Sequence, residues 1–187
     1  MRDAGTEMAQ QIVDACCLIN LFASGRQSEV IQAFGGDFYV PQRVCNEALS
    51  IRRPDPMDDA SLVSEPIDLT DALRKDLIRL CRVEGVEENE LFIGFAMELD
   101  DGEAACLAVA KMRGWAVATD DKKAIRLANA HSVPVITTPE LMHHWAEETQ
   151  ANAGVVAQAL RNIESFARFR PGNSASHYRW WTGVVAR

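Results

Sequence analysis

The chain has 187 residues, a net charge of −8 and 48% hydrophobic residues, which suits one globular α/β domain with a peripheral extension. Five cysteines, an odd number without a Cys-x-x-Cys pair, argue against a disulfide framework and a zinc knuckle and indicate free thiols in a reducing cytoplasm. No apolar run approaches the roughly 20 residues that cross a bilayer, and residues 1–10 form a polar tail without the apolar core of an export signal, so we expect a cytoplasmic protein that does not contact a membrane.

Short apolar runs alternate with amphipathic segments along most of the chain. We expect buried strands at the apolar runs Gln11–Asp14, Phe38–Val40, Leu62–Leu69 (the weakest), Trp115–Ala118 and Val133–Ile136. The first strand is expected to lead into a helix with Leu18, Ile19 and Phe22 inward. Further helices are expected at Pro41–Ser50, Thr70–Val83, Glu87–Leu99, Asp101–Arg113, Asp121–Ala130 and Thr138–Glu147. The proline-rich segment Arg52–Asp59 is expected to be an exposed loop.

This alternation predicts right-handed crossovers that build a parallel sheet with helices on both faces, an α/β fold. We expect a tail at 1–10, one domain at 11–149, and a C-terminal helix and tail at 150–187. The helix Val155–Phe169 is amphipathic, which suits docking on the domain or formation of a homodimer.

Asp14 is an acid inside an apolar segment. It follows Ile12-Val13 and precedes a run that continues through Leu18 and Ile19. A carboxylate there loses hydration, which is costly unless a cation or several donors compensate. In open parallel sheets ligands bind at the carboxyl ends of strands, where Asp14 is expected. The alternative is that Asp14 only caps the following helix.

Glu47 is an acid on the inward face of an expected helix. Val44, Glu47, Ala48 and Ile51 follow the spacing of one helical face. Glu47 is therefore a second candidate, and the alternative is an edge residue whose carboxylate reaches water.

Two further groups of acids flank predicted elements. Asp100, Asp101 and Glu103 begin an alanine-rich helix that can lie close to the sheet, although Asp100 and Glu103 also resemble a capping box. Asp120 and Asp121 leave the strand Trp115–Ala118 at its carboxyl end, and one of them could be a plain N-cap.

Together these residues are expected to bring at least four carboxylates to one end of one sheet. Packed carboxylates repel each other unless a cation lies among them, and all-oxygen ligation favours Mg²⁺ or Mn²⁺. Such a site can ionise water for attack on a phosphodiester and neutralise the leaving oxygen. The net charge of −8 is unusual for a nucleic-acid binder, but bound cations reverse the field at a carboxylate-lined site.

Four segments in this order resemble the successive motifs of PIN-domain ribonucleases: Val-Asp-Ala-Cys-Cys-Leu-Ile-Asn-Leu, Val-Pro-Gln-Arg-Val-Cys-Asn-Glu-Ala-Leu, Asp-Asp-Gly-Glu-Ala-Ala-Cys-Leu-Ala-Val-Ala and Ala-Thr-Asp-Asp-Lys-Lys-Ala. The resemblance covers about Gln11 to Glu147 and is nearest to the VapC toxins of bacterial toxin–antitoxin pairs. It implies a three-layer α/β/α fold and Mg²⁺- or Mn²⁺-dependent cleavage of RNA.

The resemblance also implies roles for individual residues. Asp14 would be the principal metal ligand and Glu47 would position water or a second ion. Glu103 would be the third acid, with Asp101 or Asp100 as substitutes. Asp120 and Asp121 are both candidates for the fourth. The family usually has serine or threonine two residues after the first acid, whereas this chain has Cys16, a weaker hydrogen-bonding group.

The expected function is a metal-dependent endoribonuclease with RNA as substrate and, as a toxin, an antitoxin protein as partner. The alternative is a PIN-like module with weak or no catalysis that binds RNA or protein. A receiver domain that accepts a phosphoryl group is disfavoured, because no lysine follows the late strand Val133–Ile136.

The four histidines are expected to be surface or packing residues. The tail Arg168–Trp181 mixes arginines with aromatics, and anchoring to the domain is favoured over stacking with bases.

Overall fold

The computed structural model describes residues 10–47 and 49–186, so the expected N-terminal tail, apart from Gln10, and Ala48 lie outside the described residues. Its centre is a five-stranded sheet in the order β5-β2-β1-β6-β7, in which all neighbouring strands are parallel. The strands are β1 (Gln11–Val13), β2 (Phe38–Pro41), β5 (Arg79–Cys81), β6 (Ala116–Ala118) and β7 (Val135–Ile136). The expected α/β fold with a parallel sheet is confirmed.

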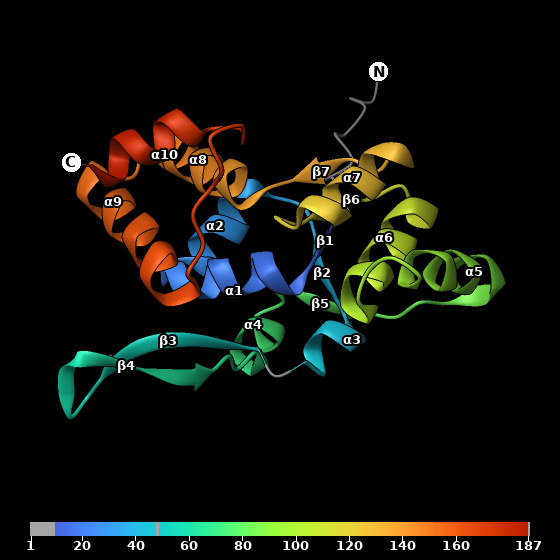
Figure 1. Cartoon of the computed structure of the whole chain (residues 1–187), viewed down its shortest axis with the longest axis horizontal. Coiled ribbons are helices and arrows are strands. Elements are labelled where there is room, and N and C mark those ends of the chain that lie inside the picture. Colours follow the sequence, from blue (N-terminus) through green and yellow to red (C-terminus); the bar gives the residue numbers. More distant parts are fainter. Residues whose placement is uncertain (1–9, 48, 187) are drawn as a thin grey trace, which may run out of the picture.

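Helices cover both faces of this sheet (Figure 1). One layer consists of α1 (Ala15–Ser24), α2 (Gln27–Phe34), α8 (Thr138–Glu148), α9 (Ala153–Asn162) and α10 (Tyr178–Val185). The other consists of α5 (Gly85–Ala96), α6 (Asp101–Arg113) and α7 (Lys122–Ala130). The short helices α3 (Gln42–Cys45) and α4 (Thr70–Arg74) follow β2 and the hairpin described below. None of the described helices is long and apolar enough to cross a membrane.

Small side chains bring α6 close to the sheet. The helix packs on β1, β2 and β6, and its residues from Ala104 to Ala110 are all buried. Because most of them are alanines, the backbone of α6 can approach the strands closely, and the amino end of the helix comes near the strand ends. Inward residues of α1 include Cys17, Leu18 and Leu21, whereas Ile19 and Phe22 are only half-buried, in partial disagreement with the expected inward face.

The segment expected to be an exposed loop forms a β-hairpin instead. β3 (Ser50–Asp55) and β4 (Asp58–Pro66) pair antiparallel in a separate two-stranded sheet, so the strand expected at Leu62–Leu69 is also misplaced. Prolines are compatible with this hairpin because both of its strands are edge strands, where a missing N–H need not break a ladder. In Figure 1 the hairpin projects from the body of the molecule and β3 runs beside α1.

Other differences from expectation concern short elements. The helix expected at Thr70–Val83 ends at Arg74, and the chain turns through Asp76, whose φ of 55° is left-handed, into β5. The helix expected at Pro41–Ser50 ends at Cys45. Helix α2 was not predicted. All these elements are shorter than the windows over which periodicity is visible.

The C-terminal segment completes the layer over α1. Helix α9 continues into η1, a π-helical stretch at Ile163–Ala167. The apolar face of this segment, with Val156, Leu160 and Ile163, is buried within the chain, where α9 contacts α1 and α10. Helix α10 follows an extended link that crosses in front of α1 in Figure 1.

Candidate metal centre

The candidate centre lies where the sheet order reverses direction. β1 and β6 are parallel neighbours, with Val13 beside Ala118, so the residues that follow them leave the sheet at the same edge. The chain builds outward from β1 through β2 on one side and through β6 on the other, and ligands bind at such switch points in open sheets. Asp14 and Thr119 are thereby placed side by side.

Asp14 is buried, with 2% of its surface exposed. Its Oδ2 accepts hydrogen bonds from the Thr119 hydroxyl at 2.8 Å and from the Cys16 thiol at 3.1 Å. Burial raises the pKa of Asp14, and the charge of Asp100 raises it further, although these hydrogen bonds oppose the shift. Asp14 occupies the N-cap position of α1, but its side chain makes no capping hydrogen bond there. Capping therefore does not explain this acid.

Asp120 and Asp121 have different surroundings. The Oδ2 of Asp120 accepts hydrogen bonds from Asn20 at 2.9 Å, from the Cys17 thiol at 3.2 Å and from the Thr138 hydroxyl. Burial nevertheless raises the pKa of Asp120. Asp121 caps α7, because its Oδ1 accepts hydrogen bonds from the amides of the second and third residues beyond it at 2.7 and 2.9 Å.

At the amino end of α6, Asp100 is a cap and Glu103 faces the other acids. Asp100 accepts a hydrogen bond from the Glu103 amide at 2.9 Å. Burial raises the pKa of Glu103 to about 7, with further upward contributions from the charges of Asp100, Asp14 and Asp121. The residues that raise this pKa come from three separate elements, so Glu103 connects the motifs electrostatically.

Asp101 points elsewhere. Its side chain is 68% exposed and forms an ion pair with Arg43 at 2.9 Å. The structure therefore does not bring this candidate to the other acids.

Glu47 reaches the group by an unexpected route. It lies in the turn after α3, and not on the inward face of a longer helix. Its carboxylate covers the buried Gly102, where an added Cβ would clash with Oε1 of Glu47 and lie 3.1 Å from Val44. Burial raises the pKa of Glu47, followed by the charges of Asp100 and Asp14. The absent side chain at Gly102 is what allows this approach.

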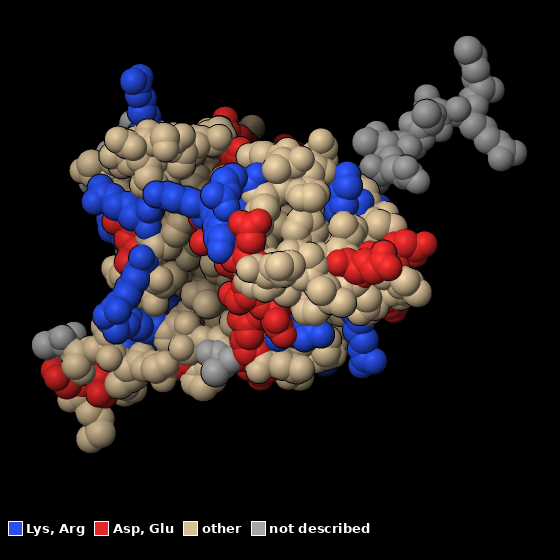
Figure 2. Space-filling view, turned by 45° about the vertical axis from the view of Figure 1, so that its right-hand side comes forward, with Lys and Arg blue, Asp and Glu red and all other residues tan. Residues whose placement is uncertain are grey.

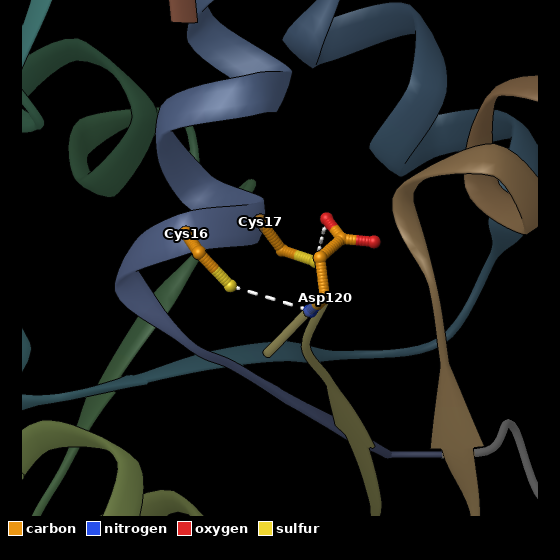
Figure 3. A group of neighbouring side chains, drawn as sticks. All are labelled: Cys16, Cys17 and Asp120. Atoms are coloured by element: carbon orange, nitrogen blue, oxygen red, sulfur yellow. Dashed lines mark hydrogen bonds between the residues drawn. The ribbon is translucent and has the colours of Figure 1, made fainter. Parts of the chain in front are cut away.

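Two thiols complete the immediate surroundings. Figure 3 shows Cys16 and Cys17, at the start of α1, directed toward Asp120. The Asp120 amide donates a hydrogen bond to the Cys16 sulfur at 3.3 Å, so Cys16 links Asp14 to Asp120. Within the described part of the chain, the only three potential ligand atoms found within 4.8 Å of one another come from Cys16, Cys17 and Asp120.

Three supporting residues were not predicted. Asn20 is 3% exposed, and Thr119 and Thr138 are fully buried. The Asn20 amide bonds both Asp120 and the Thr138 hydroxyl. A lone asparagine in the apolar run of α1 is the signal that could have identified it, because a buried amide needs partners. Thr138 carried no such signal, since it lies 18 residues after the acid that it contacts.

The donor set fits a hard divalent cation that keeps part of its water shell. Asp14, Glu103 and Asp120 offer only oxygen, which Mg²⁺ and Mn²⁺ prefer. Their carboxylate oxygens do not all lie within 4.8 Å of one another in the described residues. Mg²⁺ is usually bound by one or two carboxylates with several waters retained, so an open arrangement suits it. A cation would also relieve the repulsion that raises the pKa of Glu103.

The histidines and the C-terminal aromatics lie outside this centre. His143 stacks on His177 with ring centroids 4.0 Å apart, His144 packs on Phe34, and His131 packs on Phe95. Trp181 is fully buried, and its indole N–H donates to Glu164 at 2.9 Å. The contact of His143 with His177 and the bond from Trp181 to Glu164 attach α10 to the domain.

A family model described as a PIN domain matches residues 10–170, which include every acid considered above. No curated protein and no solved structure shows significant similarity to the chain.

Proposed function

Because the chain belongs to the PIN-domain family, whose members are typically nucleases that use divalent metals, we propose that it is an endoribonuclease that hydrolyses RNA with the help of Mg²⁺ or Mn²⁺. The observation that carries the proposal is the group formed by Asp14, Glu103 and Asp120 at one edge of the sheet. Two of these acids are held by several hydrogen bonds, and all three have raised pKa values.

The acids of the metal centre would have different roles in RNA hydrolysis. Asp14 and Asp120 would hold the cation, because Thr119, Cys16, Asn20 and Thr138 fix their orientation. Glu103 would accept the proton of the attacking water, since a bound cation would stabilise its ionised form beside Asp14 and Asp121. The bound cation would supply an activated water and neutralise the leaving oxygen. Glu47 and Asp121 would add charge and Asp101 would take no part.

Cleavage of labelled RNA in Mg²⁺ or Mn²⁺ tests the proposal. We expect Asp14→Asn to lower the rate at least about 100-fold, because the stabilisation supplied by a bound metal is several kcal/mol. Asp101→Asn is the matched control: it removes the same charge from an exposed position and is expected to cleave at nearly the parental rate. Equal rates for Asp14→Asn and the parent would show that Asp14 has no such role.

A second candidate is a PIN-like module with weak or no catalysis that binds RNA or protein. Cys16 favours it, because a thiol replaces a hydroxyl as a hydrogen-bond donor to Asp14. Calorimetry separates the two: the enzyme must bind Mn²⁺, and the binding must be lost in Asp14→Asn. A protein that binds RNA but no Mn²⁺ would support the second candidate.

We further propose a cytoplasmic toxin role, with an antitoxin protein as partner, on the strength of the resemblance to the VapC toxins. Expression in a bacterial host should arrest growth, and Asp14→Asn should restore it. Cleavage of RNA without growth arrest would remove the toxin role and leave the nuclease proposal intact.

A further inference from the structure

A groove of about 490 Å³ lies between the β3–β4 hairpin and the π-helical segment η1. The hairpin contributes one wall, the end of η1 contributes the other, and Ile19 of α1 forms part of the floor. Hereafter this is called the hairpin groove. It is lined by Ile19, Ser50, Ile51, Arg52, Leu62, Ser64, Phe166, Ala167 and Arg168.

The hairpin groove is basic although the chain is acidic. Its lining contains two arginines, Arg52 and Arg168, and no aspartate or glutamate, in a chain with a net charge of −8. Neither arginine has an ion-pair partner in the part of the chain that the structure describes, whereas most other arginines are paired with acids. Arg52 stands opposite Ser64 across the hairpin, and Arg168 follows η1 with a left-handed φ of 56°. Two unpaired guanidinium groups in one groove favour an anionic ligand.

Two segments of the chain lead from the hairpin groove to the candidate metal centre. Ile19 lies one helical turn beyond Cys16 on α1, about 4.5 Å along the helix axis. Ser50 lies three residues after Glu47 on the segment that enters β3. Figure 2 shows a hollow on this face, with acidic side chains gathered on one side and arginine and lysine side chains on the other.

An aromatic ring accompanies the basic groups. Phe166 is half-buried in the wall, and the Arg53 guanidinium lies 5.2 Å from its ring centroid. Unpaired bases stack on aromatic rings and on arginine planes, whereas the bases of a duplex are already stacked on each other. The combination of phosphate-binding and stacking groups thus suits a single strand.

We propose that the hairpin groove binds single-stranded RNA on its way into the metal centre, with Arg52 and Arg168 contacting phosphates. The inference rests on the proposed function and adds the path of the substrate to it. The β3–β4 hairpin and the C-terminal segment are then parts of the substrate-binding surface.

Binding of a short labelled oligouridylate, measured by fluorescence anisotropy in EDTA, tests the inference without cleavage. We expect the double variant Arg52→Gln, Arg168→Gln to bind at least about tenfold more weakly than the parent, because two charge-assisted contacts are lost. The slope of log K against log salt should become shallower by about 1.4, since each phosphate contact with a single strand contributes roughly 0.7. A duplex RNA of the same length should bind the parent more weakly than the single strand.

The matched control is Lys111→Gln, Arg179→Gln. It removes the same charge from exposed positions outside the hairpin groove, so a general loss of positive field affects both double variants equally. The inference is overturned if the groove variant binds like the parent, if the control weakens binding as much, if the duplex binds as well as the single strand, or if the parent does not bind RNA at all. Binding in the groove by a parent that cleaves nothing would instead refute only the nuclease proposal.

Discussion

The carboxylate of Glu103 has a pKa of about 7, well above its ordinary 4.5, because burial and neighbouring acids disfavour its charge. The folded protein therefore holds a proton that the unfolded chain releases between about pH 4.5 and 7. In the absence of metal, this group makes the free energy of unfolding fall as pH rises through that window. A bound cation reverses the preference, because it stabilises the ionised form.

We therefore predict that Mn²⁺ affinity depends on pH through Glu103. Below pH 7 a proton competes with the metal, and the affinity should fall by about tenfold for each pH unit when one proton is displaced. Calorimetric titrations between pH 5.5 and 8 measure this slope (these limits bracket the pKa of about 7). In Glu103→Gln the slope should flatten. An unchanged slope in that variant would assign the proton to another group.

At the scale of single residues, sequence patterns predict the acids better than the residues that hydrogen-bond to them. Asp14 and Asp120 can be recognised from the sequence because each follows a buried strand, and neighbouring parallel strands end at the same edge of the sheet. The sequence does not decide whether Asp120 or Asp121 belongs to the metal site, because both suit an N-cap. Only the structure shows that Asp121 caps α7. The contact between Glu47 and Gly102 depends on a turn that no periodic pattern describes.

At the scale of elements, α10 is attached to the domain mainly through one buried tryptophan. Trp181 is fully buried, donates to Glu164, and meets the edge of Phe169 with ring centroids 5.9 Å apart. The notable feature is that few other large side chains of α10 are buried, so this helix should detach when that contact is lost.

We predict that Trp181→Ala releases α10 before the sheet unfolds. Truncation of a fully buried tryptophan costs about 3–5 kcal/mol, more than a short terminal helix is expected to withstand. Limited proteolysis should then cut the link between η1 and α10 in the variant and not in the parent. Trp180→Ala is the control, because Trp180 is only half-buried and packs on His143. Equal protection of both variants would contradict this account.

Long, periodic elements are predicted well and short ones poorly. Helix α6 begins and ends at the expected residues because its alanine-rich face and its acidic start agree. The hairpin is missed because prolines and charges in Arg52–Asp59 are also typical of loops. β5 is missed because its three residues follow a left-handed turn that breaks an apparently helical run. The sheet order could be inferred only in outline, since β5 adds the edge strand.

At the scale of the whole molecule, the buried carboxylates lower the stability of the metal-free protein. Burial raises the pKa of Asp14, so its ionised form destabilises the metal-free fold at neutral pH. Chains that bind a cation only when folded gain stability by mass action, about 2.7 kcal/mol at a ligand concentration 100 times Kd.

We predict that the parent and Asp14→Asn differ in thermal stability without metal and in their response to Mn²⁺. Without metal, Asp14→Asn should have the higher Tm, by about 2–4 °C for each kcal/mol recovered in a chain of this size. With Mn²⁺, the parent should gain stability and the variant should gain little. Scanning calorimetry with and without Mn²⁺ checks both parts, with Asp101→Asn as the control for the loss of one charge. An equal Mn²⁺ response in all three proteins would indicate non-specific binding.

The π-helical turn of η1 contains one more residue than an α-helical turn, and this extra residue sets the direction of everything that follows it. In a chain one residue shorter, Arg168 would be rotated by about 100° around the helix axis. The guanidinium of Arg168 would then point away from the hairpin, although the lining residues themselves would be unchanged. The one extra residue in the π-helical turn thus determines whether the hairpin and η1 can contact the same RNA strand.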